Sequence, residues 1–163
     1  MKNLFNVLFF ALISLNVLTG CDDDDNPVRV SESLKDTFHA QFPNAARVEW
    51  EMKRGYYVAE FWDSAEMETW YNSNGSWCMT ETDLGRSVNQ LPKAVQEAFQ
   101  TSEYNQWKVD DLDKYERPDM TFYKVEVESA GKRDRNLFYA EDGTLLKNSE
   151  EKGNDEVYPD ITF

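Results

Sequence analysis

Apolar residues recur at every fourth position in two stretches of the chain, a spacing that predicts two amphipathic helices. The first helix is expected over about residues 31–42, directly before Pro43. Its apolar face consists of Leu34, Phe38 and Phe42. The second helix is expected to begin at Leu91-Pro92, because proline is favoured in a first helical turn. Its apolar face consists of Leu91, Val95 and Phe99.

After each helix the pattern changes to alternation with a period of two, which predicts β-strands. Val48, Trp50 and Met52 alternate with charged residues and mark the first strand. Arg54-Gly55 then predicts a turn, and residues 56–62 form a second strand rich in aromatic residues.

The second half of the chain repeats the pattern of the first. Placing Phe38 on Phe99 aligns the helices, and the strands align once extra residues are allowed in turns, where insertions cost little. Asn74-Gly75 and Asp142-Gly143 then coincide, and each predicts a two-residue hairpin turn. Each half is therefore predicted to be a helix followed by four antiparallel strands.

Several sequence strings resemble those of the PepSY-like family. They are FPNAARVEWE, GYYVAEF and ETWYNSNGSW in the first half, and LPKAVQEAF, WKVDDLDKY, FYKVEVES and FYAEDGTLL in the second. That family is similar in shape to beta-lactamase inhibitor protein. The resemblance implies an α+β fold in which two tandem helix-plus-four-strand antiparallel repeats, residues 31–86 and 87–148, form one curved sheet with the helices on one face. It also implies, by analogy of fold, an inhibitor-like or protease-regulating role.

The N-terminus is predicted to be removed from the mature protein. The apolar run Leu4–Leu18 would span about 22 Å as a helix, which is short of the hydrocarbon core of about 30 Å. With Lys2 before it, the run is typical of a signal peptide over residues 1–20. Leu18-Thr19-Gly20-Cys21 resembles a bacterial lipobox, which implies lipidation of Cys21. The alternative is an ordinary signal peptide.

An acidic run follows this cysteine, within a predicted tether over residues 21–30. It consists of Asp22, Asp23, Asp24 and Asp25. The run resembles an export signal that sends lipoproteins of one Gram-negative phylum to the outer face of the outer membrane. We therefore expect a surface-exposed outer-membrane lipoprotein, with the periplasmic face as the alternative. The other interpretation of the run is a solvated spacer.

The charge of the chain excludes several classes of function. Its 17 Lys and Arg stand against 31 Asp and Glu, a formal net charge of −14. Phosphate backbones and anionic membranes repel such a charge, so we expect no nucleic-acid partner and no membrane contact except through the lipid. One histidine and two cysteines offer almost nothing for a metal centre or a nucleophile–base pair. We therefore predict no catalytic residue, no metal site and no cofactor, and solvated carboxylates on the strands.

The strand over residues 56–62 suggests a binding face. If Tyr57, Ala59 and Phe61 face the helices, the other side of the strand is a candidate for binding. That side carries Tyr56, Val58, Glu60 and Trp62. Its counterpart in the second half is mostly charged and carries Phe122, Lys124, Glu126 and Glu128. Aromatic side chains on a polar face are typical of binding surfaces, and the alternative is that the tail or the curvature of the sheet covers them. The facing of Trp70 and Tyr71 is left open.

Residues 149–163 match neither half and form an acidic tail. Its apolar residues are Val157, Tyr158, Ile161 and Phe163. We expect the tail to be partly ordered, with these residues pinning it to the sheet edge, and disorder is the alternative.

Together these features predict a monomeric, non-enzymatic lipoprotein of the cell envelope that acts as a binding module for a protein or an envelope glycan. The alternative function is an acidic envelope protein that sequesters small ligands or cations.

Overall fold

The structure is a computed structural model that describes residues 28–153 and 156–163. The predicted signal peptide over residues 1–20, the lipidation site Cys21 and the acidic run Asp22–Asp25 lie outside the described residues. None of the described helices is long and apolar enough to cross a membrane.

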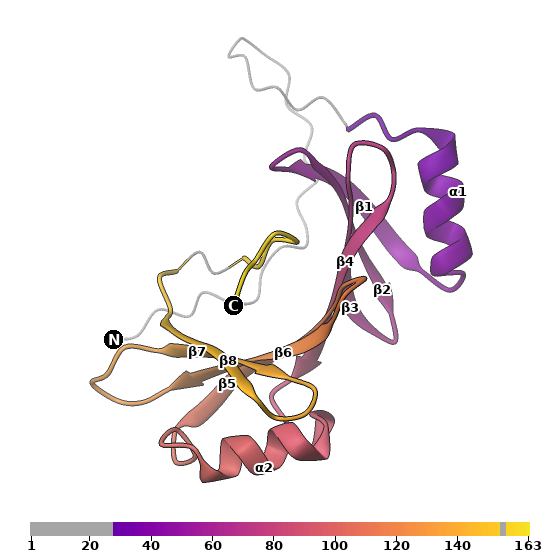
Figure 1. Ribbon diagram of the computed structural model, residues 1–163. Coiled ribbons are helices and arrows are strands. Elements are labelled where there is room, and N and C mark those ends of the chain that lie inside the picture. The colour runs from indigo at the N-terminus through magenta and orange to yellow at the C-terminus, as the bar shows by residue number, and fades with distance from the viewer. Residues whose placement is uncertain (1–27, 154–155) are drawn as a thin grey trace, which may run out of the picture.

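The chain forms one helix and four strands, and then a second helix and four more strands (Figure 1). The first group consists of α1 (Glu32–Gln41), β1 (Ala46–Lys53), β2 (Tyr56–Asp63), β3 (Ala65–Tyr71) and β4 (Trp77–Gly85). A short 3-10 helix, η1 (Val88–Gln90), leads to the second group. This group consists of α2 (Lys93–Thr101), β5 (Lys108–Glu116), β6 (Thr121–Glu128), β7 (Arg135–Ala140) and β8 (Leu145–Glu150).

The eight strands form a single antiparallel sheet in chain order, β1 to β8. Figure 1 shows that the sheet is strongly curved, with α1 and α2 on its convex side and the C-terminal segment on its concave side. The predicted α+β fold, with both helices on one face of a curved sheet, is confirmed.

Helix α1 packs on the convex face of the first strands through the apolar residues that the sequence predicted. Phe38 is fully buried and meets Phe61 of β2 in a T-shaped contact, with the ring centroids 5.0 Å apart. At the start of the helix, the Ser31 hydroxyl accepts a hydrogen bond from the Leu34 backbone N–H at 3.2 Å. This cap satisfies one of the N–H groups that the first helical turn leaves without a partner.

Strand β3 has the regular alternation that the sequence left open. The Tyr71 hydroxyl donates a hydrogen bond to Gln41 Oε1 of α1 at 3.0 Å, so Tyr71 faces the helix. Trp70 is fully buried on the opposite, concave side, in a cluster with Val58.

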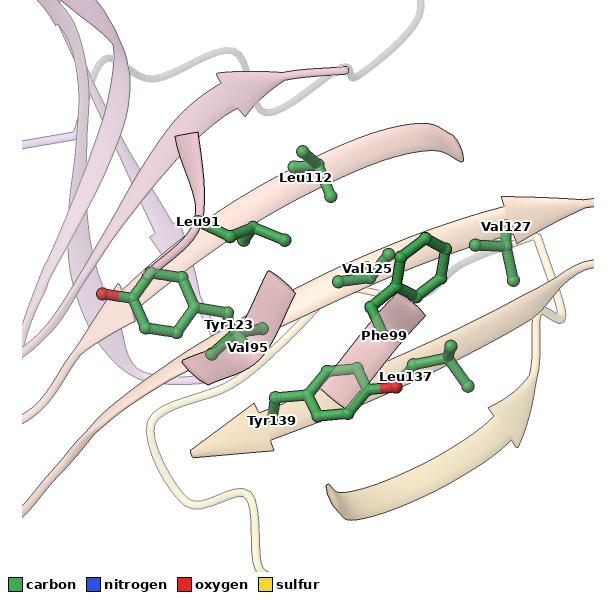
Figure 2. Close-up of a cluster of buried hydrophobic side chains, with 9 residues drawn as sticks. All are labelled: Leu91, Val95, Phe99, Leu112, Tyr123, Val125, Val127, Leu137 and Tyr139. Carbon is green, nitrogen blue, oxygen red and sulfur yellow. The ribbon is translucent and has the colours of Figure 1, made fainter. Parts of the chain in front are cut away.

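Helix α2 packs on the second group of strands in the same manner. Figure 2 shows Val95 and Phe99 of α2 among apolar side chains of β6 and β7. Those strand residues are Tyr123, Val125, Val127, Leu137 and Tyr139. The two helices therefore cover two separate apolar clusters, one on each half of the convex face.

The two glycine-containing hairpins differ from the two-residue turns that the sequence predicted. In the first hairpin the Asn72 N–H donates to the Ser76 carbonyl at 3.0 Å, which leaves the three residues 73–75 in the loop. Residues 141–143 form the matching loop between β7 and β8. The last residue of each loop is a glycine with positive φ, 79° and 87°. A two-residue type I′ turn requires positive φ at the preceding residue as well, and Asn74 and Asp142 do not adopt it.

The C-terminal tail is ordered along residues 156–163, but it lies on the face of the sheet and not at its edge. We call this segment the strap. Val157 is buried in the concave-face cluster. Tyr158 and Ile161 pack against that cluster, and Phe163 contacts the rings of Phe122 and Phe138. The expectation that the tail is pinned to the sheet edge was therefore wrong, because its apolar residues pack against the cluster on the concave face.

Candidate binding surface on the concave face

The four residues of the predicted binding face lie on the concave side of β2, but they have different environments. Glu60 is exposed, and so is Trp62, with 49% of its surface accessible. Tyr56 is half-buried beside the strap cluster, and Val58 is completely buried within it. For Val58 the structure shows the alternative that the sequence left open, because the tail covers this residue.

The predicted contrast between an aromatic and a charged half of this face does not extend to the area under the strap. Phe122 and Lys124 of β6 are buried, and Phe122 belongs to the same cluster as Val58. Each half contributes apolar side chains to the area under the strap. The open part of the face lies beyond that area, around Glu60 and Trp62.

Four glutamates lie opposite one another on four neighbouring strands. We call them the glutamate row; they are Glu49 of β1, Glu60 of β2, Glu68 of β3 and Glu81 of β4. Directly opposite residues in antiparallel strands have Cβ atoms about 4.5–5.5 Å apart, where like charges destabilise the sheet. The register thus concentrates negative charge in a line across the concave face.

The row borders a hollow of about 230 Å³ that is lined almost entirely by carboxylates. We call this feature the acidic hollow. Its acidic residues are Glu60, Glu66, Glu68, Glu81, Asp83, Asp111 and Asp113. The remaining lining residue is Met67. The hollow therefore offers hydrogen-bond acceptors and negative charge.

Two lysines neutralise part of this charge. Lys124 Nζ lies 3.3 Å from Asp113 Oδ2 and 3.5 Å from Glu126. Lys53 Nζ lies 3.0 Å from Glu68 and 2.9 Å from Glu51. Within residues 28–153 and 156–163, no basic side chain forms an ion pair with the three other glutamates at the hollow: Glu60, Glu66 and Glu81. The negative charge of the hollow is thus only partly compensated.

Burial and mutual repulsion raise the pKa of several of these carboxyl groups. Burial raises the pKa of Glu81 first of all, and the charges of Asp113 and Glu68 raise it further. Burial also raises the pKa of Asp113, and the attraction of Lys124 only partly opposes that rise. Partial desolvation raises the pKa of Glu60 first, and the negative charge of Glu68 raises it further. Simultaneous ionisation of these carboxyl groups is therefore unfavourable and lowers the stability of the fold. A bound cation would reduce this electrostatic cost.

Two groups of three carboxylates are close enough to hold a hard cation. The first is Glu51, Glu60 and Glu68, and the second is Asp83, Asp111 and Asp113. Within each group, ligand oxygens lie within 4.8 Å of one another. Such oxygens are suited to Ca²⁺ or Mg²⁺. The sequence predicted no metal site and kept cation sequestration only as the alternative function; the structure shows which carboxylates come together.

Sequence reasoning placed the strand glutamates on outward faces but missed the acidic hollow. Glu68, Glu81 and Asp113 come from three different strands, and the pairing register brings them together. A signal was present in the sequence, because several neighbouring strands carry an acid at an outward position. Recognising it would have required the register, which depends on long-range pairing.

A family model of beta-lactamase-inhibitor-like, PepSY-like proteins matches residues 55–147, more than half of the chain. The chain belongs to the PepSY-like family. The matched segment includes β2 to β7 and the first half of β8, so it contains Glu60, Trp62 and every residue of the acidic hollow.

Solved structures of similar proteins come from Bacteroides species. A BLIP-like protein from Bacteroides fragilis is 38% identical, with a TM-score of 0.78, and the alignment covers 86% of this PepSY-like chain and 100% of that protein. A DUF2874 family protein from Bacteroides ovatus is 32% identical, with a TM-score of 0.69 and coverages of 77% and 89%. One from Bacteroides uniformis, 23% identical with a TM-score of 0.70 and coverages of 75% and 90%, shares the fold. A comparison with curated proteins gave no match.

Proposed function

We propose that this PepSY-like protein is a non-enzymatic binding module of the cell envelope, and that the open part of its concave face holds a basic region of a protein partner. The glutamate row carries this proposal. Like charges on directly opposite strand positions reduce stability, and a partner that supplies Lys or Arg side chains would remove that cost on binding.

Trp62 supports the same proposal. It is the exposed aromatic residue of β2 and stands on the concave side beside Glu60 and Glu66. Tryptophan at the centre of an interface commonly contributes much of the binding energy, and surrounding charges give orientation and specificity. A neutral glycan would stack on the indole and donate hydroxyl hydrogen bonds to the carboxylates, but it would leave their negative charge uncompensated, so a basic protein fits the surface better.

The similarity to a BLIP-like protein supports an inhibitor-like or protease-regulating role. This part of the proposal rests on family and fold, since fold alone does not specify the partner. The PepSY-like module is proposed to be a monomer, and its two helix-plus-four-strand halves are proposed to be tandem copies of one unit.

The proposed location rests on the N-terminal sequence. We propose that the protein is attached to the outer membrane by a lipid on Cys21, and that Asp22–Asp25 direct it to the cell surface. In the alternative location, on the periplasmic side, the same concave face would be available to envelope proteins.

The experiment compares wild-type protein with the double substitution Glu60→Gln and Glu68→Gln. Each is immobilised and exposed to a basic model peptide, oligo-lysine, and to an envelope extract at low and high salt. We expect the double variant to lose at least about tenfold in affinity for oligo-lysine, and to lose the stoichiometric partner that the wild type retains. Glu103→Gln, an exposed change after α2, is the matched control and should behave as the wild type.

Equal retention of the same partner by wild type and double variant would contradict the proposal. The second candidate function is sequestration of cations, and the two carboxylate groups of three favour it. A rise in melting temperature on addition of Ca²⁺, abolished by Asp83→Asn, would support this second function.

A further inference from the structure

The strap occupies an apolar groove on the concave face, separate from the acidic hollow. The floor of the groove consists of Val58, Trp70, Met79, Tyr115, Phe122 and Phe138. These side chains come from β2 to β7, so the groove crosses the junction between the two halves of the sheet. Such a continuous apolar floor would be an exposed hydrophobic patch without the strap.

The first part of the strap is held by a carboxylate and an aromatic ring. Glu156 Oε1 lies 2.6 Å from Lys53 Nζ. The Tyr158 ring meets Trp70 edge-on at 5.5 Å between centroids, and the Arg54 guanidinium lies 3.7 Å from the centre of the Tyr158 ring. Between these two residues, Val157 is the buried aliphatic contact.

The last part of the strap is held by its backbone and its final residue. Arg117 Nη1 donates a hydrogen bond to the Ile161 carbonyl at 2.8 Å. The Phe163 ring lies 5.0 Å from Phe122 and 5.7 Å from Phe138, centroid to centroid. The groove therefore recognises an extended segment through a carboxylate, an aliphatic side chain, aromatic rings and one backbone carbonyl.

The strap fits this groove only in part. Val157 is its buried residue, whereas Phe163 has 42% of its surface exposed. A hollow of about 270 Å³ remains beside it, lined by residues that include Phe138, Lys147 and Ile161. No residue of the strap belongs to a strand, so the sheet does not hold it by ladder hydrogen bonds. In these respects the strap resembles a peptide bound on the surface of the sheet more than a strand or helix of the core.

We propose that this groove is a peptide-binding site and that the strap is its built-in ligand. A protein partner displaces the strap with an extended segment of the same chemistry, a carboxylate followed by an aliphatic and an aromatic residue. The strap protects the apolar floor until such a segment arrives. Because a tethered ligand acts at an effective concentration of roughly millimolar, an external segment competes with it at a disadvantage.

Lys53 links the groove to the acidic surface. Its ammonium pairs with Glu156 of the strap and with Glu68 of the glutamate row. In the displaced state, the carboxylate of the incoming segment takes the place of Glu156 beside Lys53. The same lysine thus contacts both the groove and the glutamate row, so an incoming segment without a carboxylate would change the charge balance of the row.

The test uses the full chain and a labelled synthetic peptide with the sequence of residues 156–163, EVYPDITF. Its binding is measured by fluorescence anisotropy to the wild type and to two strap variants, Val157→Asp and Ile161→Asp. We expect the variants to bind the peptide at least about tenfold more tightly than the wild type, because their own straps no longer compete. Asp160→Asn, at an exposed strap position, should bind as the wild type does.

Two further arms define the site. A peptide that carries the Val157→Asp change should bind none of the proteins, and adding Arg54→Ala to the Ile161→Asp chain should weaken binding of the normal peptide. Circular dichroism and cooperative melting establish folding. Folded variants that bind the peptide no better than the wild type overturn the proposal. If neither strap variant folds, the strap is part of the core and the proposal also fails. The peptide does not use the acidic hollow, so either result leaves the proposed function to its own test.

Discussion

Phe61 and Trp62 are neighbours in β2 and show how one strand serves both faces of the sheet. Phe61 has 2% of its surface exposed and packs against Phe38 and Phe42 on the convex side. Trp62 points to the concave side and is 49% exposed. Alternation along a strand separates a residue that stabilises the fold from one that is free to bind.

We expect Phe61→Ala to lower the free energy of unfolding by about 3–5 kcal/mol, because it leaves a cavity beneath α1. Trp62→Ala should cost about 1 kcal/mol or less, as exposed substitutions generally do, while weakening partner binding. Urea melts of both variants measure the difference. An equal loss of stability in the two variants would show that Trp62 is a packing residue and would remove it from the binding surface.

Glu81 gives the protein an unusual dependence on pH. Its native pKa is raised from 4.5 to about 8, mainly by burial and then by repulsion from Asp113. Between these two values the native state binds more protons than the unfolded state, so the free energy of unfolding rises as pH falls from about 8 toward 4.5. Carboxyl groups with lowered pKa, such as Glu156 and Asp119, lose their contribution only at lower pH and do not oppose this rise.

Glu81→Gln should stabilise the protein at about pH 8 by on the order of 1 kcal/mol and flatten the stability profile between about pH 5 and pH 8. Gln keeps a side-chain oxygen that accepts hydrogen bonds, and the Tyr115 hydroxyl keeps its own acceptor, Asp113 Oδ2 at 3.5 Å. Chemical denaturation at several pH values provides the measurement, with Glu103→Gln as the exposed control. A profile for Glu81→Gln as steep as that of the wild type would refute the assignment of the pH dependence to this side chain.

At the scale of elements, the β7–β8 loop lies very close to α2 at a position occupied by a glycine. A Cβ atom on Gly143 would lie 2.6 Å from the Ala94 carbonyl oxygen of α2. The corresponding Gly75 in the β3–β4 loop has a similar positive φ, and its Cβ would lie 3.8 Å from Leu34 Cδ1. The two loops have the same backbone conformation, but α2 approaches its loop more closely than α1 does.

This difference predicts unequal effects of the same substitution. Gly75→Ala should cost about 1–2 kcal/mol, the strain of a left-handed conformation for an L-residue. Gly143→Ala should cost clearly more, because the helix backbone must also move. Thermal melts measure both, and hydrogen exchange in α2 should increase only in Gly143→Ala. Equal losses of stability in the two variants would show that the close approach of α2 to Gly143 does not affect the free energy of unfolding.

At the scale of the whole molecule, both faces of one sheet are occupied in different ways. The helices bury the convex face, and the strap buries part of the concave face. The remaining concave surface carries the glutamate row and Trp62. A single sheet thus provides a stable core and an open charged surface without a second domain.

The anchor of the molecule is tested by Cys21→Ala. A diacylglycerol with a further chain gives stable attachment, since each buried CH₂ contributes about 0.8 kcal/mol. We expect the variant to fold and to be released from membranes, or to accumulate as uncleaved precursor, as cell fractionation would show. A processed variant that still fractionates with membranes as the wild type does would disprove lipidation at Cys21.

Changing Asp22, Asp23, Asp24 and Asp25 together to Ala tests the direction of export. The variant should remain membrane-bound but become resistant to protease added to intact cells. If the variant is digested as completely as the wild type, the acidic run is only a spacer. If the wild type itself resists the added protease, the protein lies at the periplasmic face.

The element types and the facing of most strand residues could be predicted from sequence, because both depend on local geometry. The four-residue spacing of Leu34 and Phe38 fixes the buried side of α1, and alternation fixes the sides of Phe61 and Trp62. The positions of the loop glycines could also be predicted, because the preference of glycine for positive φ is a local property of the backbone. The loop length was missed, because the φ angle of Asn74 depends on how the strands pair.

Only the tertiary structure decided how these faces are used. Val58 and Phe122 lie on strand sides of different composition, one rich in aromatic residues and one mostly charged, yet the strap covers both of them. Glu68 and Glu81 meet because the strand register sets them opposite each other, and a shift of one residue would separate them. The helices, the strands and their apolar sides can be derived from the amino-acid pattern, since these features follow from the periodicity of the backbone. Register, curvature and the path of the strap follow from contacts between distant segments, and these contacts created the acidic surface.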